Sequence, residues 1–321
     1  MPTIFDALPG MEVPVDGITR GFAKLWENTE EMDQKAMQLN LVVHFGFATT
    51  EKDALEQFRV AGRLAERYPC RVVILCPLGD DTKEKEMRAK IYGECFTGKS
   101  KGDTRCIEIV ALSYPPSAKS YLQDQVSICL STDLPIYFWA HRFTSSQRMG
   151  SYRYLLTRSQ RVMFDSAIVS ADALSYAWPN ISAVRDLAYT RTLPLRQNIG
   201  QFLSRYAPPL IVEGLQEVTI RHRAQLAGEA SCLLGWVKKG LVRSGANVDH
   251  GITFTVTPID CAGCFSLQFI YSDKKKHFEW SADLTKDNAE FTGDLGTGKS
   301  TQTVSAHFMV PEAALAEAMF F

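Results

Sequence analysis

Apolar and polar positions alternate in blocks through the first two thirds of the chain. Apolar runs over residues 39–47 and 71–76 predict buried strands. The stretch from 51 to 68 repeats apolar residues at helical spacing, and Thr50 is a candidate cap for that helix. Further helices are predicted over residues 18–26, 117–129 and 146–158, and further strands over 136–140 and 162–164. Strands that alternate with helices predict an α/β domain with a mainly parallel sheet.

Between residues 87 and 114 the apolar period changes to two, which predicts a β-hairpin with a polar tip from Thr97 to Asp103. Cys95 and Cys106 could then face each other across the two strands, within reach of a disulfide. In a reducing cytosol, we expect them to remain packed thiols.

The segment Ala207-Pro208-Pro209 interrupts the pattern after two helical stretches, so the predicted domains are residues 1–207 and 208–321. Beyond the break, the pattern predicts a strand at 218–220, a helix over 224–242, strands at 253–257, 265–271, 278–282 and 301–308, and a short final helix. Strands separated by turns predict a smaller α+β domain, with an antiparallel sheet and a helix on one face.

Composition narrows the class of partner. Among 321 residues, 45% are hydrophobic and 22% are charged, and the formal net charge is -1, so no bulk field favours nucleic acid or an anionic membrane. The start of the chain lacks the features of a signal peptide, and no run of eighteen apolar residues occurs. Most of the eight cysteines lie in apolar runs, as buried thiols do. We therefore expect a cytoplasmic protein.

Two segments match the phosphate-loop pattern, residues 293–300 (GDLGTGKS) and 93–100 (GECFTGKS). A phosphate loop follows a buried strand and opens a helix, but here a polar stretch precedes the first match and a strand follows it. We therefore interpret residues 293–300 as a hairpin turn. Residues 98–102 also have the form of a nucleophile elbow around Ser100, but that turn joins two strands. No catalytic residue is predicted.

A single CxxC, Cys261 to Cys264, could be half a zinc site or a redox pair. No second cysteine pair or close histidine pair completes a zinc site, so a turn between two strands is predicted, with no metal and no cofactor. Among the scattered histidines, His141 beside Arg142 is the best placed, because ligands favour the carboxyl ends of strands in an α/β layer. A solvent-facing loop is the simpler interpretation of this pair.

Several segments together resemble the OpcA family, the assembly or activator proteins of glucose-6-phosphate dehydrogenase. Residues 186–196 (DLAYTRTLPLR) are similar to the family's DLAWTR segment followed by a proline and an arginine, with Tyr189 in place of the usual tryptophan. Shorter matches follow the family's order: residues 25–26 (LW), 69–74 (PCRVVI), 134–139 (LPIYFW), 161–166 (RVMFDS) and 233–236 (LLGW). The resemblance spans about residues 15–240.

The resemblance implies a non-enzymatic partner that binds glucose-6-phosphate dehydrogenase, promotes its active oligomer and raises its activity in the oxidative pentose phosphate pathway. In photosynthetic members this activation is linked to redox state. The redox candidates here are Cys95, Cys106, Cys261 and Cys264.

Aromatic residues and arginines dominate many interfaces, so Tyr189, Arg191 and Arg196 are candidate partner contacts, as are His141 and Arg142. The alternative gives the first three a structural role, in which Tyr189 packs between helices and the arginines pair with carboxylates such as Asp186.

Two other functions remain open. One is a nucleotide-binding or sugar-phosphate-binding enzyme on the N-terminal layer, with Arg71, His141, Arg142 and Arg191 as phosphate ligands. The other is a binding module whose small ligand reports metabolic state.

Overall fold

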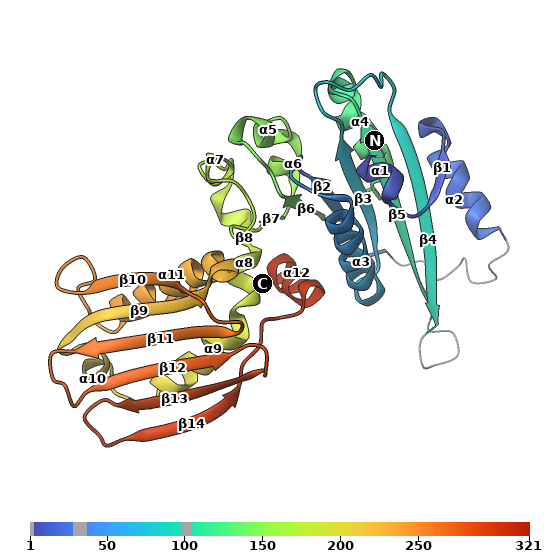
Figure 1. The fold of residues 1–321 in the computed structure, drawn as a ribbon. Coiled ribbons are helices and arrows are strands. Elements are labelled where there is room, and N and C mark those ends of the chain that lie inside the picture. The colour runs from blue at the N-terminus through green and yellow to red at the C-terminus, as the bar shows by residue number, and fades with distance from the viewer. Residues whose placement is uncertain (1–2, 28–36, 98–103) are drawn as a thin grey trace. The chain divides into compact units, whose positions relative to one another are not determined.

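A computed structural model describes residues 3–27, 37–97 and 104–321, and the chain divides into two compact units. The N-terminal unit comprises residues 1–187 together with 311–321, and the C-terminal unit comprises residues 188–310 (Figure 1). The boundary expected after residue 207 lies inside the second unit. The reason is that helix α9 (Leu193–Leu203), which precedes that position, contributes to the core of the C-terminal unit.

In the described residues of the N-terminal unit, eight strands form one sheet, and their order across it is β1-β4-β5-β3-β2-β6-β7-β8 (Figure 1). The strands are β1 (Met11–Val13), β2 (Leu39–Phe45), β3 (Cys70–Pro77), β4 (Arg88–Thr97), β5 (Thr104–Tyr114), β6 (Ile136–His141), β7 (Arg161–Phe164) and β8 (Val184–Asp186). The six strands from β5 to β8 in this order are parallel, and β4 and β1 extend the sheet in antiparallel pairing. The prediction of a mainly parallel α/β sheet is therefore confirmed.

Helices cover both faces of this sheet. They are α1 (Ile4–Ala7), α2 (Ile18–Trp26), α3 (Glu51–Arg67), α4 (Lys119–Cys129), α5 (Ser146–Gly150), α6 (Arg153–Arg158), α7 (Ala171–Leu174) and α12 (Pro311–Phe320). One core, which includes Leu41 and Val43 of β2, packs under α1, α3 and α12, and the other, which includes Val42, packs under α2, α4 and α6. Strand β2 is buried at every position because both of its faces are covered.

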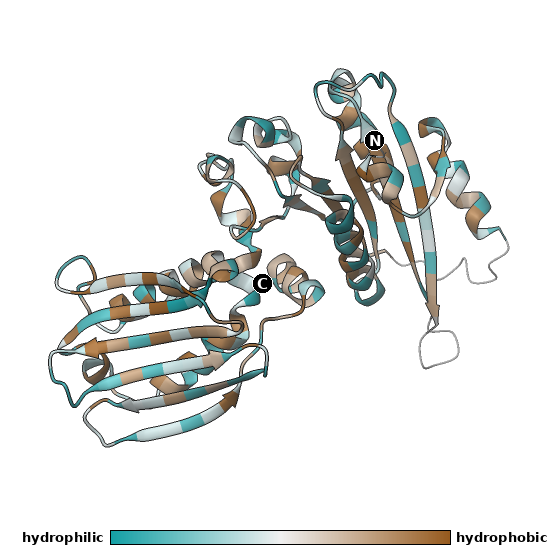
Figure 2. Ribbon diagram, in the orientation of Figure 1, coloured by the Kyte–Doolittle hydropathy of each residue, from teal (hydrophilic) through white to brown (hydrophobic). Residues whose placement is uncertain are grey.

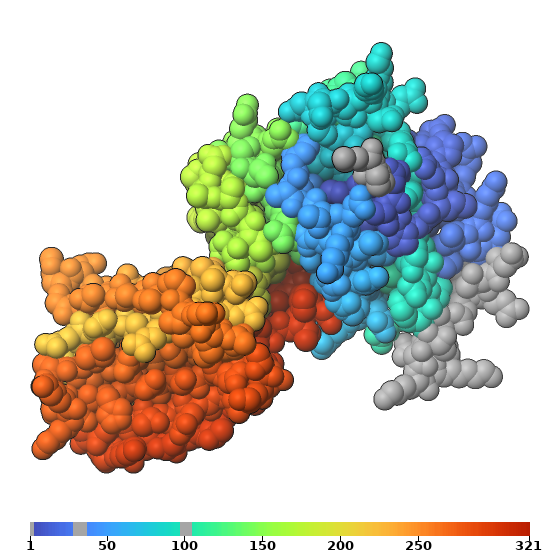
Figure 3. Space-filling model, viewed as in Figure 1, coloured from blue at the N-terminus to red at the C-terminus, as the bar shows by residue number. Residues whose placement is uncertain are grey.

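The last helix, α12, packs in the N-terminal unit against α3 and β7 (Figure 3). Its buried residues Leu315 and Met319 belong to the same core as Phe58 of α3. Arg63 of α3 and Glu312 of α12 form an ion pair at 3.1 Å. The sequence predicted a helix here but assigned it to the C-terminal domain.

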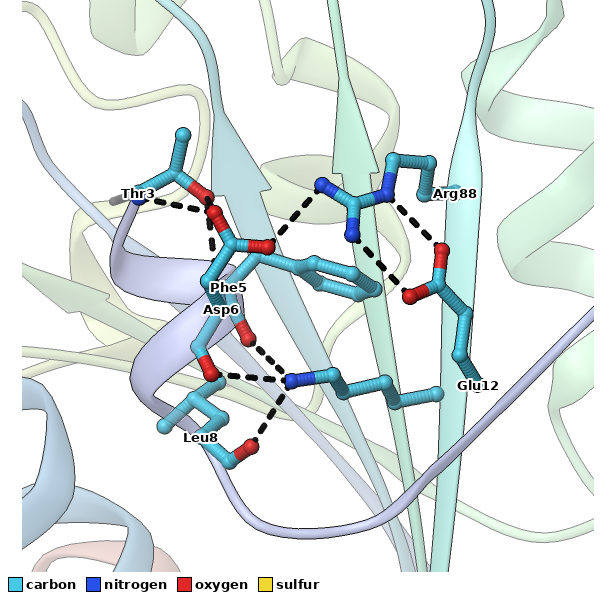
Figure 4. A network of polar contacts seen from close by, with 7 residues as sticks. Thr3, Phe5, Asp6, Leu8, Glu12 and Arg88 are labelled. Atoms are coloured by element: carbon cyan, nitrogen blue, oxygen red, sulfur yellow. Dashed lines mark hydrogen bonds and ion pairs between the residues drawn. The ribbon is translucent and has the colours of Figure 1, made fainter. Parts of the chain in front are cut away.

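Ion pairs and hydrogen bonds hold the segment from Thr3 to Glu12 against the start of β4 (Figure 4). Arg88 contacts Asp6 at 3.0 Å and Glu12 at 2.8 Å, and Lys90 donates hydrogen bonds to the backbone carbonyls of Phe5, Asp6 and Leu8. The hydrogen bond from the Thr3 amide, with help from Arg88, lowers the pKa of Asp6, and the hydrogen bond from Arg88 lowers the pKa of Glu12. Both carboxylates thus stay ionised to hold this sheet edge.

The C-terminal unit has a six-stranded sheet in the order β10-β9-β11-β12-β13-β14. Its strands are β9 (Leu215–Arg223), β10 (Thr253–Ile259), β11 (Cys264–Tyr271), β12 (His277–Asp283), β13 (Asn288–Asp294) and β14 (Ser300–Ser305). Strand β10 runs parallel to β9, and the other pairs are antiparallel. The predicted, mostly antiparallel sheet is confirmed, although the pattern missed β13.

Helices α9, α10 (Pro208–Val212) and α11 (Ala227–Arg243) accompany this sheet, and α8 (Leu187–Arg191) leads into the unit. Residues of α9 and α11 share one core with alternate sheet residues such as Phe265, Leu267 and Phe269. Between them on β11, Ser266 and Gln268 are only partly buried, as expected for a sheet packed on one face. Figure 2 shows the resulting alternation of apolar and polar positions along these strands.

Candidate functional site

The strand order reverses at β2 in the N-terminal sheet, and this places a crevice at the carboxyl edge. The connection from β2 to β3 carries α3 on one face, whereas the connection from β5 to β6 carries α4 on the other. Ligands of α/β sheets bind at such a reversal. The loops after β2, β3, β5 and β6 line a pocket of about 210 Å³ there, formed by Phe47, Pro77, Leu78, Asp80, Tyr114, Pro116, Lys119, Gln147, Arg148 and Ser151.

Charged groups lie at the mouth of this carboxyl-edge pocket. The Arg148 guanidinium lies 3.9 Å from the centre of the Phe47 ring and contacts Asp80 at 3.2 Å. The Lys119 ammonium donates a hydrogen bond to the Ser151 hydroxyl at 3.3 Å. Two cations and one carboxylate suit a small anionic ligand better than a cationic one.

One residue of the pocket wall, Tyr114, pairs with a second tyrosine, Tyr152. The hydroxyls of Tyr114 and Tyr152 are 2.7 Å apart and buried. Burial raises the pKa of Tyr152 to about 12 and the pKa of Tyr114 well above its usual value. Both phenols therefore stay protonated at neutral pH, and they can donate hydrogen bonds but cannot act as bases.

His141 and Arg142, the predicted pair at the end of β6, both bind Asp53. His141 Nε2 lies 2.8 Å from Asp53 Oδ2, and Arg142 Nε donates to the same oxygen. The expectation of a solvent-facing loop is wrong for His141, which is only 2% exposed. Arg142 has a positive φ of 49°, and Gly46 of the β2 to α3 loop passes so close that a Cβ there would lie 2.0 Å from the Arg142 carbonyl oxygen. The close approach of the backbone after β2 to the backbone after β6 therefore fixes the position of His141 and Arg142.

Asp53 lies in the first turn of α3, where the predicted cap is confirmed because the Thr50 hydroxyl accepts a hydrogen bond from the Asp53 amide at 3.2 Å. Burial alone would raise the pKa of Asp53. The hydrogen bond and charge of His141, joined by Gln57 and Arg142, outweigh burial and lower this pKa well below its usual range. The carboxylate therefore links α3 to the end of β6 and cannot serve as a proton donor at neutral pH.

Toward the amino end of β3, Arg71 forms a buried ion pair with Glu108 of β5. Arg71 Nε donates to Glu108 Oε2 at 3.2 Å, and Trp26 Nε1 donates to Glu108 Oε1 at 3.0 Å. Gly93 makes room for the indole, since a Cβ there would lie 2.6 Å from the Trp26 ring. Arg71 thus has a structural partner, and it lies at the opposite end of β3 from the carboxyl-edge pocket.

Sequence reasoning missed Glu108, Asp53 and His44 as important polar residues. Glu108 is 3% exposed and His44 is 1% exposed, and burial lowers the pKa of His44 to about 3, so its ring is neutral. A charged residue within an otherwise apolar alternation, as at Glu108, was an available signal of a buried ion pair.

The phosphate-loop match at 293–300 is a hairpin turn, as predicted. It joins β13 to β14, which pair in antiparallel register with Gly293 opposite Ser300. The amides of Gly296 and Gly298 donate to Asp294 Oδ1 at 2.9 and 3.2 Å, so a carboxylate of the chain itself takes the donors that a phosphate would need. The second match begins within β4, and its Lys99 and Ser100 lie outside the described residues.

Both cysteine pairs named as redox candidates form disulfide bonds. Cys95 and Cys106 are opposite each other on β4 and β5 with Cα atoms 4.0 Å apart, so the expectation of packed thiols there is corrected. Cys261 and Cys264 form a second disulfide in the turn between β10 and β11. The thiols of Cys70 and Cys129 are buried, which raises their pKa values to about 12 and about 11. Those two thiols are therefore poor nucleophiles.

Tyr189, Arg191 and Arg196, the candidates from residues 186–196, each contact a neighbour within the C-terminal unit. The Arg196 guanidinium lies 3.7 Å from the centre of the Tyr189 ring, and Arg191 Nε donates to Glu229 Oε1 at 2.7 Å. Tyr189 remains 38% exposed, whereas Arg196 is 8% exposed. The structural alternative expected the arginines to pair with carboxylates, and Arg191 does so with Glu229, while Asp186 accepts hydrogen bonds from the amide and hydroxyl of Ser166. Among these candidates, Tyr189 presents the most accessible surface.

Within the described ranges, no group of three or more histidine, cysteine, aspartate or glutamate side chains is placed to hold a metal ion. No helix in the same ranges is long and apolar enough to cross a membrane.

Two comparisons with known proteins bear on identity. Residues 61–177 match the family model described as "Glucose-6-phosphate dehydrogenase subunit N-terminal domain". The chain is also 23% identical over 193 residues to an OxPP cycle protein OpcA of Synechocystis sp., an alignment that covers 58% of this chain and 40% of that relative. The chain thus matches well under two thirds of the relative's length.

Proposed function

We propose that this chain, whose N-terminal domain belongs to the OpcA family, is a non-enzymatic, cytoplasmic accessory protein of glucose-6-phosphate dehydrogenase. In this role it binds the dehydrogenase, promotes its active oligomer and raises its activity in the oxidative pentose phosphate pathway. The observation that carries the proposal is the family match over residues 61–177, which contains the five strands from β3 to β7 in chain order.

The polar residues of the chain support binding better than turnover. Asp294 already accepts the amides of the phosphate-loop match, Glu108 pairs with Arg71, and Asp53 pairs with His141 and Arg142. An accessory protein works by having a higher affinity for one state of its partner than for another. It therefore needs a stable interface, on the order of 1,200–2,000 Å² of total buried surface, and no reactive centre.

Tyr189 is our candidate for a direct contact with the dehydrogenase. The residue is 38% exposed, and the Arg196 guanidinium lies against its ring. Arg196 is in turn hydrogen-bonded to the Thr192 hydroxyl and to the Tyr189 carbonyl, both at 3.2 Å. A ring supported in this way loses little conformational entropy on binding, which is a property of interface hot spots.

The test mixes the purified chain with the dehydrogenase of its own organism, under reducing and under oxidising conditions. We expect a complex on size-exclusion chromatography at micromolar concentration, with a higher rate or a lower KM of the dehydrogenase, and no turnover by the chain alone. Tyr189→Ala should weaken the complex about tenfold, which corresponds to about 1.4 kcal/mol.

Tyr121 of α4 is a matched control, since it is an exposed tyrosine at 66%. Tyr121→Ala should leave the complex unchanged, and circular dichroism should show both variants folded. If no complex forms and saturating amounts change neither rate nor KM in either redox condition, the proposal is wrong. An oxidation-dependent effect that disappears in Cys106→Ser or in Cys264→Ser would assign the redox response to that disulfide.

The carboxyl-edge pocket favours a second candidate function, a site for a small anionic metabolite such as a sugar phosphate. Arg148 and Lys119 line this pocket and would contact the anion, in which case Arg148 would leave Asp80. Arg71 and Arg191, two of the phosphate ligands expected from the sequence, do not line it and pair with Glu108 and Glu229. Stabilisation of the chain in a thermal shift with glucose 6-phosphate, NADP or ATP, abolished in Arg148→Ala, would support this function.

A further inference from the structure

A second pocket, of about 350 Å³, lies within the C-terminal unit and differs in chemistry from the carboxyl-edge pocket. It is lined by α9, α10 and α11, by the segment between α9 and α10, and by Phe269 of β11. Its deepest residues are buried, with Phe269 at 1%, Leu241 at 3% and Val237 at 4% exposed. The pocket therefore reaches from the helical layer down to the core of the unit, and we name it the interhelical pocket.

Every residue that lines the interhelical pocket is uncharged. Aliphatic side chains and the rings of Trp236, Tyr206 and Phe269 form most of its wall, and hydroxyl groups come from Ser204, Ser244 and Tyr206. A charged ligand would lose its hydration there without an opposite charge to compensate, which costs several kcal/mol. A neutral, mainly apolar ligand loses no such hydration, and it gains free energy from the area that it buries.

Glycines in the helices create part of this space. Gly240 of α11 lines the pocket, and a Cβ built on it meets no heavy atom within 4 Å. Gly200 of α9 faces Trp236, whose ring edge would lie 3.8 Å from a Cβ at that position. A glycine inside a helix is about 1 kcal/mol less favourable than an alanine. The chain thus bears a cost in helix stability at positions that keep the interhelical pocket open.

The volume sets the size of the ligand. An apolar cavity of about 150 Å³ in another protein stays dry and binds benzene. At about 350 Å³, the interhelical pocket has room for a ligand of two fused rings, within the usual range of small-molecule sites. We propose that the interhelical pocket binds a neutral small molecule with an aromatic ring system, which packs against Trp236 and Phe269 while its polar group lies near the hydroxyl groups.

The test uses the full chain without the dehydrogenase, so its outcome is independent of the proposed function. The probes are 2-naphthol, which is neutral at pH 7, and 2-naphthoate, which has the same rings and a negative charge. Isothermal titration calorimetry should show saturable binding of 2-naphthol and at least tenfold weaker binding of 2-naphthoate.

Gly240→Leu fills the interhelical pocket and should weaken binding of 2-naphthol at least tenfold. The variant should fold, because leucine favours a helix more than glycine does. Gly235→Leu is the matched control. Gly235 lies in the same helix, a Cβ there also meets nothing within 4 Å, and the residue does not line the pocket. Binding to Gly235→Leu should equal that of the unmodified chain.

Three results would overturn the proposal. The first is no binding of 2-naphthol up to its solubility limit, and the second is equal affinity for the neutral and the anionic probe. The third is equal loss of binding in Gly240→Leu and Gly235→Leu. If the chain binds neither probe but Gly240→Leu weakens its complex with the dehydrogenase, the pocket accepts a partner side chain and the small-molecule site is wrong.

Discussion

Two carboxylates of the N-terminal unit each pair with an arginine, but they differ in how far they are removed from water. The side chain of Glu108 is 4% exposed and that of Arg71 is 24% exposed, whereas the side chains of Asp53 and Arg142 are 15% and 32% exposed. Glu108 lies near the amino end of β3, and Asp53 lies at the carboxyl edge of the sheet, where ligands of α/β folds bind.

The contrast between Glu108 and Asp53 separates charged residues that maintain the fold from charged residues that shape an accessible edge of the sheet. The donors around Glu108 are an arginine and an indole held by packing, so this cluster maintains the fold. The donors around Asp53 link the first turn of α3 to the end of β6, so this cluster fixes the carboxyl edge of the sheet, where ligands of α/β folds bind. In both clusters the arginine already has a carboxylate partner.

Much of the fold could be predicted from the sequence because burial on both faces produces apolar runs. Strands β2 and β3 followed directly from this pattern, whereas α3 followed from the helical spacing of its apolar residues and from its Thr50 cap. Strand β13 was missed because its inward residues, Ala289, Phe291 and Gly293, include two small ones and give a weak alternation.

The clusters could not be predicted, because their contacts join residues far apart in the chain. Trp26 and Glu108 are separated by 82 positions, and Asp53 and His141 by 88. Periodicity gives the face of a strand on which a residue lies, but it does not give the neighbour across the sheet. For the same reason, the sequence predicted a final helix but not its place on α3.

The largest effect is expected from Glu108→Ala. Arg71 and the Trp26 indole both donate hydrogen bonds to this carboxylate, and the substitution removes that shared acceptor. The free energy of unfolding should fall by about 3 kcal/mol. Urea denaturation at pH 7 measures this change.

Glu12→Ala is the control for Glu108→Ala, because Glu12 pairs with Arg88 at a surface where its side chain is 47% exposed. This variant should cost less than about 1 kcal/mol. Equal losses in the two variants would show that burial does not separate the two ion pairs. The double variant Arg71→Met with Glu108→Leu should recover part of the loss, since it leaves no unpaired charge.

An intermediate effect is expected from Asp53→Asn, together with a change in pH dependence. The pKa of Asp53 is lower in the folded chain than its usual value of 3.8, so its contribution to stability is present above about pH 4 and is lost as the pH falls further. At pH 7, the variant should be about 1–2 kcal/mol less stable.

Below pH 4, the difference between Asp53→Asn and the unmodified chain should shrink, and denaturation curves from pH 7 down to pH 3 would measure this. Glu51→Gln changes an exposed carboxylate in the same first turn of α3 and should show a smaller, nearly constant difference. A difference for Asp53→Asn that stays constant over this range would contradict the role assigned to the ionised carboxylate.

The smallest effect is expected from Lys299→Ala, in the turn that carries the phosphate-loop letters. Lys299 is exposed, and the turn around it is held by Asp294 and by glycines with positive φ of 95° and 102° at positions 296 and 298. Substitution should change the free energy of unfolding by less than about 0.5 kcal/mol and should leave activation of the dehydrogenase unchanged. Asp294→Ala should cost more, about 1 kcal/mol, because two amides lose their acceptor. Asp294→Ala is therefore expected to have the larger effect. In a nucleotide site the lysine that contacts the phosphate would matter most, so the larger effect would come from Lys299→Ala. A tenfold loss of nucleotide affinity or of dehydrogenase activation in Lys299→Ala, with the fold intact, would show that this turn has the function that its letters suggest.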